Sequence, residues 1–321
     1  MTLAELAAEA PIYRQNPDSK IERAMITIKK ILVPVDFSDL SIKALIVANK
    51  VAQMFEARVT PVHVHVPVSE MDEPYALGMS SSLYQDLDKV QVNLSKSLTQ
   101  TAEKHVSPAV LTKPEILFGN PSQSLIDKAN DFDIVIMSSH GRTGFSRFLL
   151  GSVAEKLLRL APVPVMIIED ETGVGQFERI LVTTDLSENS RAVFPLARTF
   201  AAKAGSKIHL LNVLSFEQVE MEDEEKVLES TRLEELEALV EEEFKEFKDQ
   251  LTYNVETAFT SPHEAILRHV RKYDYNLVLM STVGRTGIKH LMMGSTTTNV
   301  VRHVDRAVLS INPRAKTVES Y

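Results

Sequence analysis

The chain has 321 residues, 44% of them hydrophobic, and is long enough for two domains of ordinary size. Its 44 acidic and 35 basic side chains give a formal net charge of -9, so no global positive field attracts nucleic acid or an anionic membrane. The absence of cysteine excludes disulfides and thiolate chemistry, and with no apolar run of membrane-span or signal-peptide length it predicts a soluble, cytoplasmic protein.

The N-terminal part is predicted to be an extension over residues 1–25, in which Leu3 to Ala10 has the composition of a short helix. A first domain is expected over 26–170, in which short β-branched runs alternate with amphipathic helices. Its strands are expected near residues 29–35, 58–65, 112–117, 133–138 and 164–168.

A polar, glycine-containing linker is expected at 171–177, followed by a second domain over 178–315 and a tail over 316–321. The strands of the second domain are expected near residues 178–184, 207–213, 253–259, 276–281 and 307–311. The acidic segment 217–248 is predicted to be a surface helix with one packed face, and a partner-binding or metal-binding role is the alternative. The packed face would consist of Val227, Leu233, Leu236, Leu239, Val240 and Phe244.

The two domains are copies of one another. "KKILVPVDFSDLSIKAL" matches "ERILVTTDLSENSRAVF", so that Asp36 corresponds to Asp185. Later, "DFDIVIMSSHGRTGFSRFLLGS" matches "YDYNLVLMSTVGRTGIKHLMMGS". Nearly continuous Val, Ile and Leu strands separated by helices are typical of a parallel sheet covered on both faces. The predicted fold class is therefore α/β, with two tandem, doubly wound, Rossmann-like domains of five parallel strands each.

A glycine-containing loop follows the fourth strand of each copy and leads into a helix that begins at Gly151-Ser152 or Gly294-Ser295. Such a helix N-terminus at the carboxyl edge of a parallel sheet can hold phosphate without a lysine. The spacing fits neither a P-loop nor the dinucleotide fingerprint G-x-G-x-x-G. A phosphate site and a tight turn with a simple helix cap both remain open from the residues alone.

Gly141, nine further residues and then Gly151-Ser152 resemble the nucleotide loop of the universal stress protein family. The resemblance extends to "ILVPVDFS", "VHV", "GNPSQSLIDKA" and "APVPVMII", and its doubling resembles the tandem members of that family. It implies a fold similar to the adenine-nucleotide alpha-hydrolases. It also implies that the fifth strands, Val163 to Ile168 and Ala307 to Ile311, pair within the chain as they would in a family dimer.

The resemblance implies an ATP site in each copy, with the aspartate near the ribose and adenine and the glycines under the triphosphate. In the first copy the site would contain Pro34, Val35, Asp36, Val64, Met137, Ser138, His140, Gly141, Arg142, Gly151, Ser152 and Val153. In the second copy it would contain Thr184, Asp185, Val213, Met280, Ser281, Gly284, Arg285, Gly294 and Ser295.

Both copies depart from the family pattern, because Ser138 and Ser281 replace its first glycine. The second copy departs further, and its changes are Thr183 for Pro34, Thr184 for Val35, Thr260 for Gly119 and Val283 for His140. The first copy is therefore expected to be the main nucleotide site.

Several side chains have two interpretations each. His140 is a loop residue that bonds a neighbour or phosphate, or a general base. His63 and His65 are unliganded strand residues or a metal pair. Asp36 and Asp185 bond a sugar hydroxyl or hold Mg²⁺. Arg142 and Arg285 pair with phosphate or are solvated.

The resemblance favours an ATP-binding stress-response regulator, with AMP or ADP as alternative ligands and Mg²⁺ as an accompanying ion. Its expected partners are an unidentified protein and itself, through the intrachain pair or a further homodimer. The alternatives are a protein-interaction scaffold that has lost its nucleotide, and a slow ATP hydrolase, for which the sequence offers no complete set of base and metal ligands.

Overall fold

The computed structural model describes residues 25–66, 82–141, 150–170, 172–173, 177–216, 222–284 and 293–315. Residues 1–24 of the expected N-terminal extension and the tail at 316–321 lie outside the described residues. Residues 25–170 are called the first half below, and residues 177–315 the second half.

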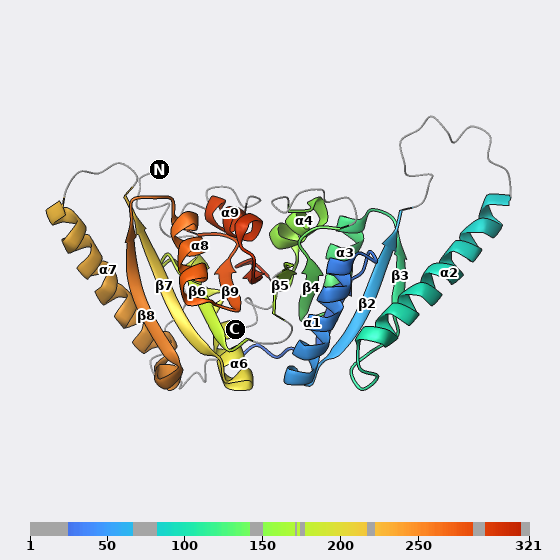
Figure 1. The fold of residues 1–321 in the computed structure, drawn as a ribbon, viewed down its shortest axis with the longest axis horizontal. Helices are drawn as coiled ribbons and strands as arrows, with labels where there is room; N and C mark the ends of the chain where they lie inside the picture. Colours follow the sequence, from blue (N-terminus) through green and yellow to red (C-terminus); the bar gives the residue numbers. More distant parts are fainter. Residues whose placement is uncertain are drawn as a thin grey trace, which may run out of the picture.

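The ten strands of the described chain form one continuous sheet in the order β3-β2-β1-β4-β5-β10-β9-β6-β7-β8 (Figure 1). The first half contributes β1 (Lys30–Pro34), β2 (Arg58–His65), β3 (Glu115–Phe118), β4 (Ile134–Ser138) and β5 (Val165–Ile168). The second half contributes β6 (Arg179–Thr183), β7 (Lys207–Ser215), β8 (Leu251–Ala258), β9 (Leu277–Ser281) and β10 (Ala307–Ile311). The strands within each half are parallel, as expected.

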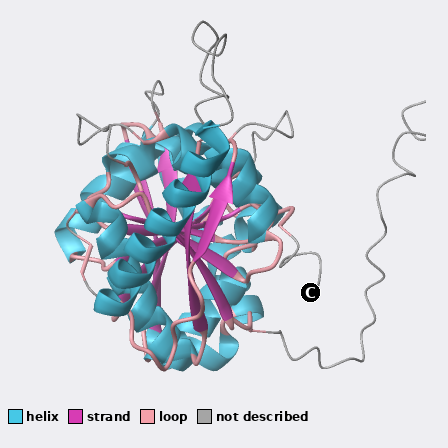
Figure 2. Cartoon of the chain, turned by 90° about the vertical axis from the view of Figure 1, so that its right-hand side faces the viewer, coloured by secondary structure: helices cyan, strands magenta, loops and turns pink. Residues whose placement is uncertain are grey.

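Helices cover both faces of the sheet in each half (Figure 2). The helices of the first half are α1 (Asp39–Phe55), α2 (Ser82–His105), α3 (Pro121–Ala129) and α4 (Ser152–Leu160). Those of the second half are α5 (Glu188–Arg191), α6 (Phe194–Ala204), α7 (Glu222–Glu243), a 3₁₀ turn at Lys245–Gln250, α8 (Pro262–Tyr273) and α9 (Ser295–His303). The buried residues fall into two clusters, one under α1 and α6 and one under α3, α4, α8 and α9, which confirms the doubly wound fold.

The two halves join through β5 and β10, which pair antiparallel with Ile167 opposite Val308 and Met166 opposite Leu309. This pairing confirms the expectation that the fifth strands satisfy each other within one chain. On one face of the junction, Phe200 of α6 packs against Phe55 of α1 with ring centroids 5.1 Å apart. The apolar core on this face is therefore continuous from one half to the other.

Two helices of the second half differ from the sequence-based expectation. The helix expected after β6 is broken into α5 and α6, because Pro195 at the start of α6 has no N–H to continue the preceding turn. In the acidic helix α7, Leu236, Leu239 and Val240 are buried, but Val227 is 65% exposed and Leu233 is 38% exposed. The expected packed face is thus restricted to the C-terminal part of the helix. Among the described helices, none is both long enough and apolar enough for a transmembrane span.

Candidate functional site

A cavity of about 320 Å³, called the first pocket, opens at the carboxyl edge of the sheet in the first half. It lies beside β1, which pairs with β2 on one side and β4 on the other, so the chain winds in opposite directions from this point. Such a switch point is where ligands bind in open α/β sheets. The lining residues are Pro34, Val35, Asp36, Val62, His63, Val64, Pro121, Leu125, Met137, Ser138, Ser139, His140, Gly141, Gly151, Ser152, Val153 and Ala154.

The carboxylate of Asp36 is held in a fixed orientation at the end of β1. The backbone N–H and the hydroxyl of Ser38 both donate to Asp36 Oδ1, at 3.0 and 2.6 Å. This turn requires Phe37 to adopt a left-handed backbone conformation with φ of 65°. Since Ser38 engages Oδ1, the second oxygen, Oδ2, faces Gly141 across the pocket.

Gly141 and Gly151 bring two backbone segments close to their neighbours. A Cβ atom at position 141 would collide with Asp36 Oδ2, and one at position 151 would lie 3.2 Å from the Ser139 carbonyl oxygen. The Gly151 N–H donates to that same carbonyl over 2.8 Å. The two glycines therefore bound a single cavity, and close backbone approach explains why glycine stands at both positions.

Helix α4 begins at this cavity, and its first residues, Ser152, Val153 and Ala154, line it. Gly151 is the N-cap residue, and it makes no side-chain cap. Ser152 lines the cavity, and its hydroxyl makes no hydrogen bond among the described residues. The unpaired N–H groups and the helix dipole give this end a partial positive charge of roughly half an electron. The site can therefore accept an anion.

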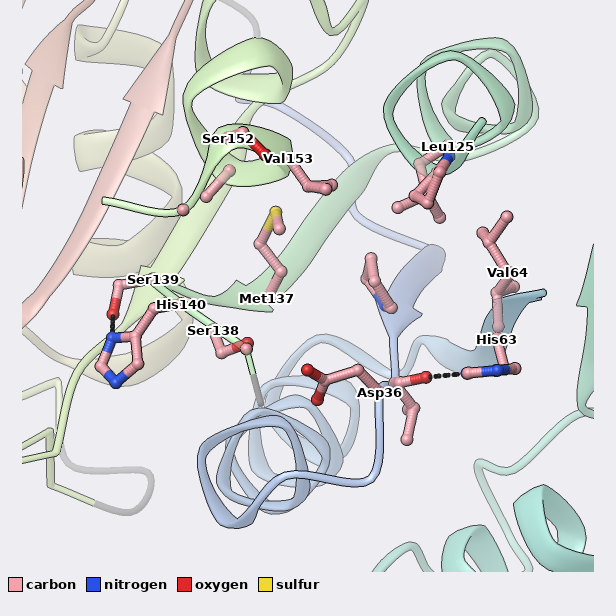
Figure 3. A pocket seen from close by; sticks show the side chains of 17 residues that line it. Asp36, His63, Val64, Leu125, Met137, Ser138, Ser139, His140, Ser152 and Val153 are labelled. Atoms are coloured by element: carbon pink, nitrogen blue, oxygen red, sulfur yellow. Dashed lines mark hydrogen bonds between the residues drawn. The ribbon is translucent and has the colours of Figure 1, made fainter. Parts of the chain in front are cut away.

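Met137, Val64 and Leu125 surround the other end of the same space, with Leu125 projecting from α3 (Figure 3). These side chains are apolar, so this end suits an uncharged, flat group. Leu125 and Pro121, which lies one helical turn before it in α3, were not among the site residues expected from the sequence. The motif "GNPSQSLIDKA" contains both residues, but its helical spacing does not reveal that one end of α3 reaches the pocket.

The His140 ring points away from the centre of the pocket and toward Ser139 (Figure 3). His140 Nδ1 lies 2.9 Å from Ser139 Oγ. Burial raises the pKa of Glu169 to about 7. The Ser139 hydroxyl and Lys43 counteract this rise, while Asp170 and Asp305 add to it. Glu169 was not singled out from the sequence.

His63 and His65, the candidate metal pair, have other neighbours. His63 Nδ1 lies 2.7 Å from the Val35 carbonyl oxygen, which can only accept, so this nitrogen donates. The His65 ring packs edge-on against Phe118 with centroids 5.8 Å apart. Within the described part of the chain, no three His, Asp or Glu side chains are grouped as metal ligands would be.

The second half repeats the arrangement in a cavity of about 250 Å³, called the second pocket. Ser187 donates to Asp185 Oδ1 from its backbone and its hydroxyl, at 3.0 and 2.5 Å, and a Cβ at position 284 would lie 2.5 Å from Asp185 Oδ2. Its lining is richer in hydroxyl groups than that of the first pocket, because it contains Thr183, Thr184, Ser190, Ser281, Ser295, Thr296 and Thr297.

The structure brings most of the sequence-predicted residues together. In the first pocket these are Pro34, Val35, Asp36, Val64, Met137, Ser138, His140, Gly141, Gly151, Ser152 and Val153. In the second pocket they are Thr184, Asp185, Val213, Met280, Ser281, Gly284, Gly294 and Ser295. Arg142 and Arg285 lie outside the described residues.

The sequence pattern of the universal stress protein family matches residues 27–169 and again residues 176–312. The chain belongs to this family and contains its domain twice.

Individual relatives agree with this assignment. A universal stress protein of Methanocaldococcus jannaschii is 32% identical over 143 residues, which is 44% of this chain and 82% of the relative. A universal stress protein of Mycolicibacterium smegmatis is 25% identical over 301 residues, covering 88% of this chain and 97% of the relative. The crystal structure of a universal stress protein from Archaeoglobus fulgidus has the same fold, with a TM-score of 0.61 and 23% identity over 88% of this chain and 96% of that one.

Proposed function

We propose that the chain is an ATP-binding regulatory member of the universal stress protein family, with the nucleotide held in the first pocket. The observation that carries the proposal is that Gly141 and Gly151 bound one cavity at the N-terminus of α4. Side chains larger than hydrogen would fill that space. A cavity with an exposed helix N-terminus at one end and apolar walls at the other matches the two ends of a nucleotide.

In this proposal each group of the ligand has a matching part of the pocket. The base lies against Val64 and Met137, the sugar hydroxyls bond the Asp36 carboxylate, and the phosphates approach Gly141 and Gly151. The Ser152 hydroxyl and the α4 N–H groups donate to phosphate oxygens. Mg²⁺ accompanies the triphosphate, and ADP and AMP are weaker ligands because they place fewer charges near the helix end.

The output of the proposed site is regulatory: a bound nucleotide changes a surface that a protein partner or the other half recognises. His140, the candidate general base, bonds Ser139 and is turned from the cavity centre, which favours binding over turnover. As part of the same proposal, a boundary within residues 171–177 separates two family domains. The cysteine-free composition supports a cytoplasmic location.

Calorimetry with ATP, ADP, AMP and a non-nucleotide triphosphate tests the proposal. We expect ATP to bind the purified full-length chain and Gly151→Val to abolish binding in the first pocket. The equivalent Gly294→Val serves as the matched control and should leave that binding intact. Circular dichroism and the melting temperature report whether each variant is folded.

Adenine nucleotide that copurifies and is identified by mass spectrometry would support the proposal. Nucleotide-free protein that shows no heat of ATP binding would reject it and would favour the scaffold alternative. Steady turnover of ATP that is lost in Asp36→Asn would favour the hydrolase.

A further inference from the structure

The second pocket differs from the first in the chemistry of its walls rather than in its framework. Both pockets have an aspartate held by a serine, a glycine close to that aspartate, and a helix whose N-cap is glycine. The second pocket is smaller, at about 250 Å³ against about 320 Å³, and seven Ser and Thr residues line it, against three in the first. The hydrogen bonds of these hydroxyls therefore determine which ligand suits it.

Four of the seven hydroxyls are already used inside the protein. Thr184 Oγ1 lies 2.8 Å from Ser190 Oγ. Ser281 donates to the Val283 carbonyl oxygen over 2.9 Å, and Thr297 donates to the Ser281 carbonyl oxygen over 2.8 Å. All four residues are at most 8% exposed. They stabilise the wall of the pocket and are not available to a ligand.

The other three hydroxyls line the cavity and make no hydrogen bond among the described residues. They belong to Thr183, Ser295 and Thr296. The equivalent residues of the first pocket are Pro34, Ser152 and Val153, so only one of these positions has a hydroxyl there. A ligand that covers a hydroxyl without bonding it leaves the cost of its desolvation unrepaid. The second pocket therefore favours a ligand with hydrogen-bonding groups at both ends.

Thr183 lies on the wall against which the base of a nucleotide would rest in the first pocket. It is the last residue of β6, it pairs with Leu211 of β7, and its strand pairs with β9, which contributes Met280 to the same wall. A flat base on this wall would cover the hydroxyl without bonding it, because the hydrogen-bonding groups of a base lie in the plane of the ring. A sugar or polyol hydroxyl can bond it from any direction.

The charges around the second pocket suit one phosphate rather than three. Its lining includes the Asp185 carboxylate but, in the described part of the chain, no Lys, Arg or His side chain, and Val283 stands where the first pocket has His140. Helix α9 begins at Gly294 without a side-chain cap, and this end has a partial positive charge of roughly half an electron. One phosphate can be held there, whereas further phosphates would add negative charge beside Asp185.

We propose that the second pocket binds the monophosphate ester of a sugar or another polyol. The phosphate lies at the start of α9 and accepts from the Ser295 and Thr296 hydroxyls. The Asp185 carboxylate accepts from ligand hydroxyls, and the Thr183 hydroxyl bonds the end farthest from the phosphate. Nucleotide binding in the first pocket is not needed for this site. The chain then has one ligand for each half.

Calorimetry with ribose 5-phosphate tests the proposal in the full-length Gly151→Val variant, in which the first pocket is filled by the valine side chain. We expect ribose 5-phosphate to bind this variant more tightly than ATP, ribose or inorganic phosphate do. Adding Gly294→Val should abolish the binding. No binding of ribose 5-phosphate, tighter binding of ATP, or equally tight binding of inorganic phosphate overturns the inference.

The hydroxyls are tested one at a time with Thr183→Val and Thr296→Val, which keep nearly the same side-chain shape. The loss of one hydrogen bond should weaken ribose 5-phosphate binding by about two- to ten-fold in each variant. Ser152→Ala, the matched loss of a hydroxyl in the first pocket, should leave this affinity unchanged. Circular dichroism and the melting temperature report whether each variant is folded.

Wild-type affinity for ribose 5-phosphate in both threonine variants overturns the inference. A wild-type chain that binds ribose 5-phosphate but not ATP would reject the function proposed for the first pocket and leave this site intact. The two proposals therefore fail on different results.

Discussion

The His63 imidazole and the Asn212 amide make the same hydrogen bond at equivalent positions of the two halves. His63 Nδ1 lies 2.7 Å from the Val35 carbonyl oxygen, and Asn212 Nδ2 donates to the Thr184 carbonyl oxygen over 2.8 Å. Each of these carbonyls directly precedes the aspartate of its pocket. Two different side chains therefore stabilise the same strand end, one in each half.

This equivalence predicts the outcome of substitutions at His63. His63→Leu should lower the free energy of unfolding by about 1–3 kcal/mol, because it leaves the buried Val35 carbonyl without its donor. His63→Asn should lower it less, since asparagine makes the bond in the second half. Urea denaturation measures both variants, and equal losses would contradict the shared role.

Gly141→Ala should weaken ligand binding to the first pocket. The added methyl group would overlap Asp36 Oδ2, and relieving such an overlap costs about 1–3 kcal/mol. Gly173→Ala is the matched control, because a Cβ there meets nothing within 4 Å. Calorimetric titration with ATP measures the affinity of each variant. Wild-type affinity in Gly141→Ala would show that Asp36 can move aside without cost.

Glu56→Gly should stabilise the protein by about 1 kcal/mol. Glu56 is the C-cap of α1 with φ of 53°, a left-handed conformation that is unfavourable for a residue with a Cβ. The equivalent C-cap of α6 is Gly205, with φ of 65°. Among the described residues, Glu56 forms one ion pair, an exposed contact of 3.8 Å between its Oε2 and Lys29 Nζ, so its loss should matter little.

The reverse change, Gly205→Ala, should destabilise the second half, because alanine has a Cβ and would have to adopt the left-handed conformation of this C-cap. Thermal and urea denaturation of both variants, measured side by side, checks the pair. If Glu56→Gly were destabilising, the exposed Lys29 contact would contribute more than the backbone conformation costs.

Phe200→Ala should destabilise both halves together by about 3–5 kcal/mol. The Phe200 ring packs against Phe55 of the first half, with centroids 5.1 Å apart, and against Phe177, 5.5 Å apart. The truncation therefore opens a cavity in a core that the halves share. Urea unfolding monitored by one probe in each half should give coincident transitions. Separate midpoints in the wild type would contradict a shared core.

Acidification should destabilise the second half through two neighbouring histidines. Burial lowers the pKa of both His209 and His269 from the ordinary value of 6.5. Their rings stack with centroids 5.0 Å apart, and His269 Nδ1 lies 2.8 Å from Glu256 Oε2. A lowered folded-state pKa means that the unfolded chain binds more protons, so stability is full above pH 6.5 and falls as the pH drops below it.

The pH effect can be assigned with a double variant, His209→Gln with His269→Gln. Its free energy of unfolding should decline less than that of the wild type between pH 7 and pH 5. All other titratable side chains are the same in both proteins. The difference between the two curves of unfolding free energy against pH therefore comes from the two histidines. Parallel curves would show that neither ring changes its protonation on unfolding in this range.

Much of the fold could be predicted from the sequence because its strands are nearly continuous apolar runs. The ranges expected at 58–65 and 307–311 match β2 and β10 as the structure has them. The strand expected at 112–117 begins later, at Glu115, because Leu111 makes only an isolated bridge to Val59. The break between α5 and α6 before Pro195 was not expected, because the apolar residues on either side of it retain the spacing of a continuous helix.

The site could be predicted in part. Asp36, Gly141 and Gly151 belong to motifs, and those motifs meet at one cavity because parallel strands end at the same edge. Glu169 was missed because its surroundings are set by burial in the fold and by residues far away in the chain, such as Asp305 of the other half. No local pattern records such a contact, since it depends on the β5–β10 pairing.

The antiparallel contact between β5 and β10 also affects how the protein can evolve. Two identical subunits that met at this contact would carry every substitution in both pockets. In a single covalent chain each side is encoded separately, so His140 and Val283 can differ without a matching change in the opposite pocket. Fusion thus permits one half to specialise while the other preserves the shared scaffold.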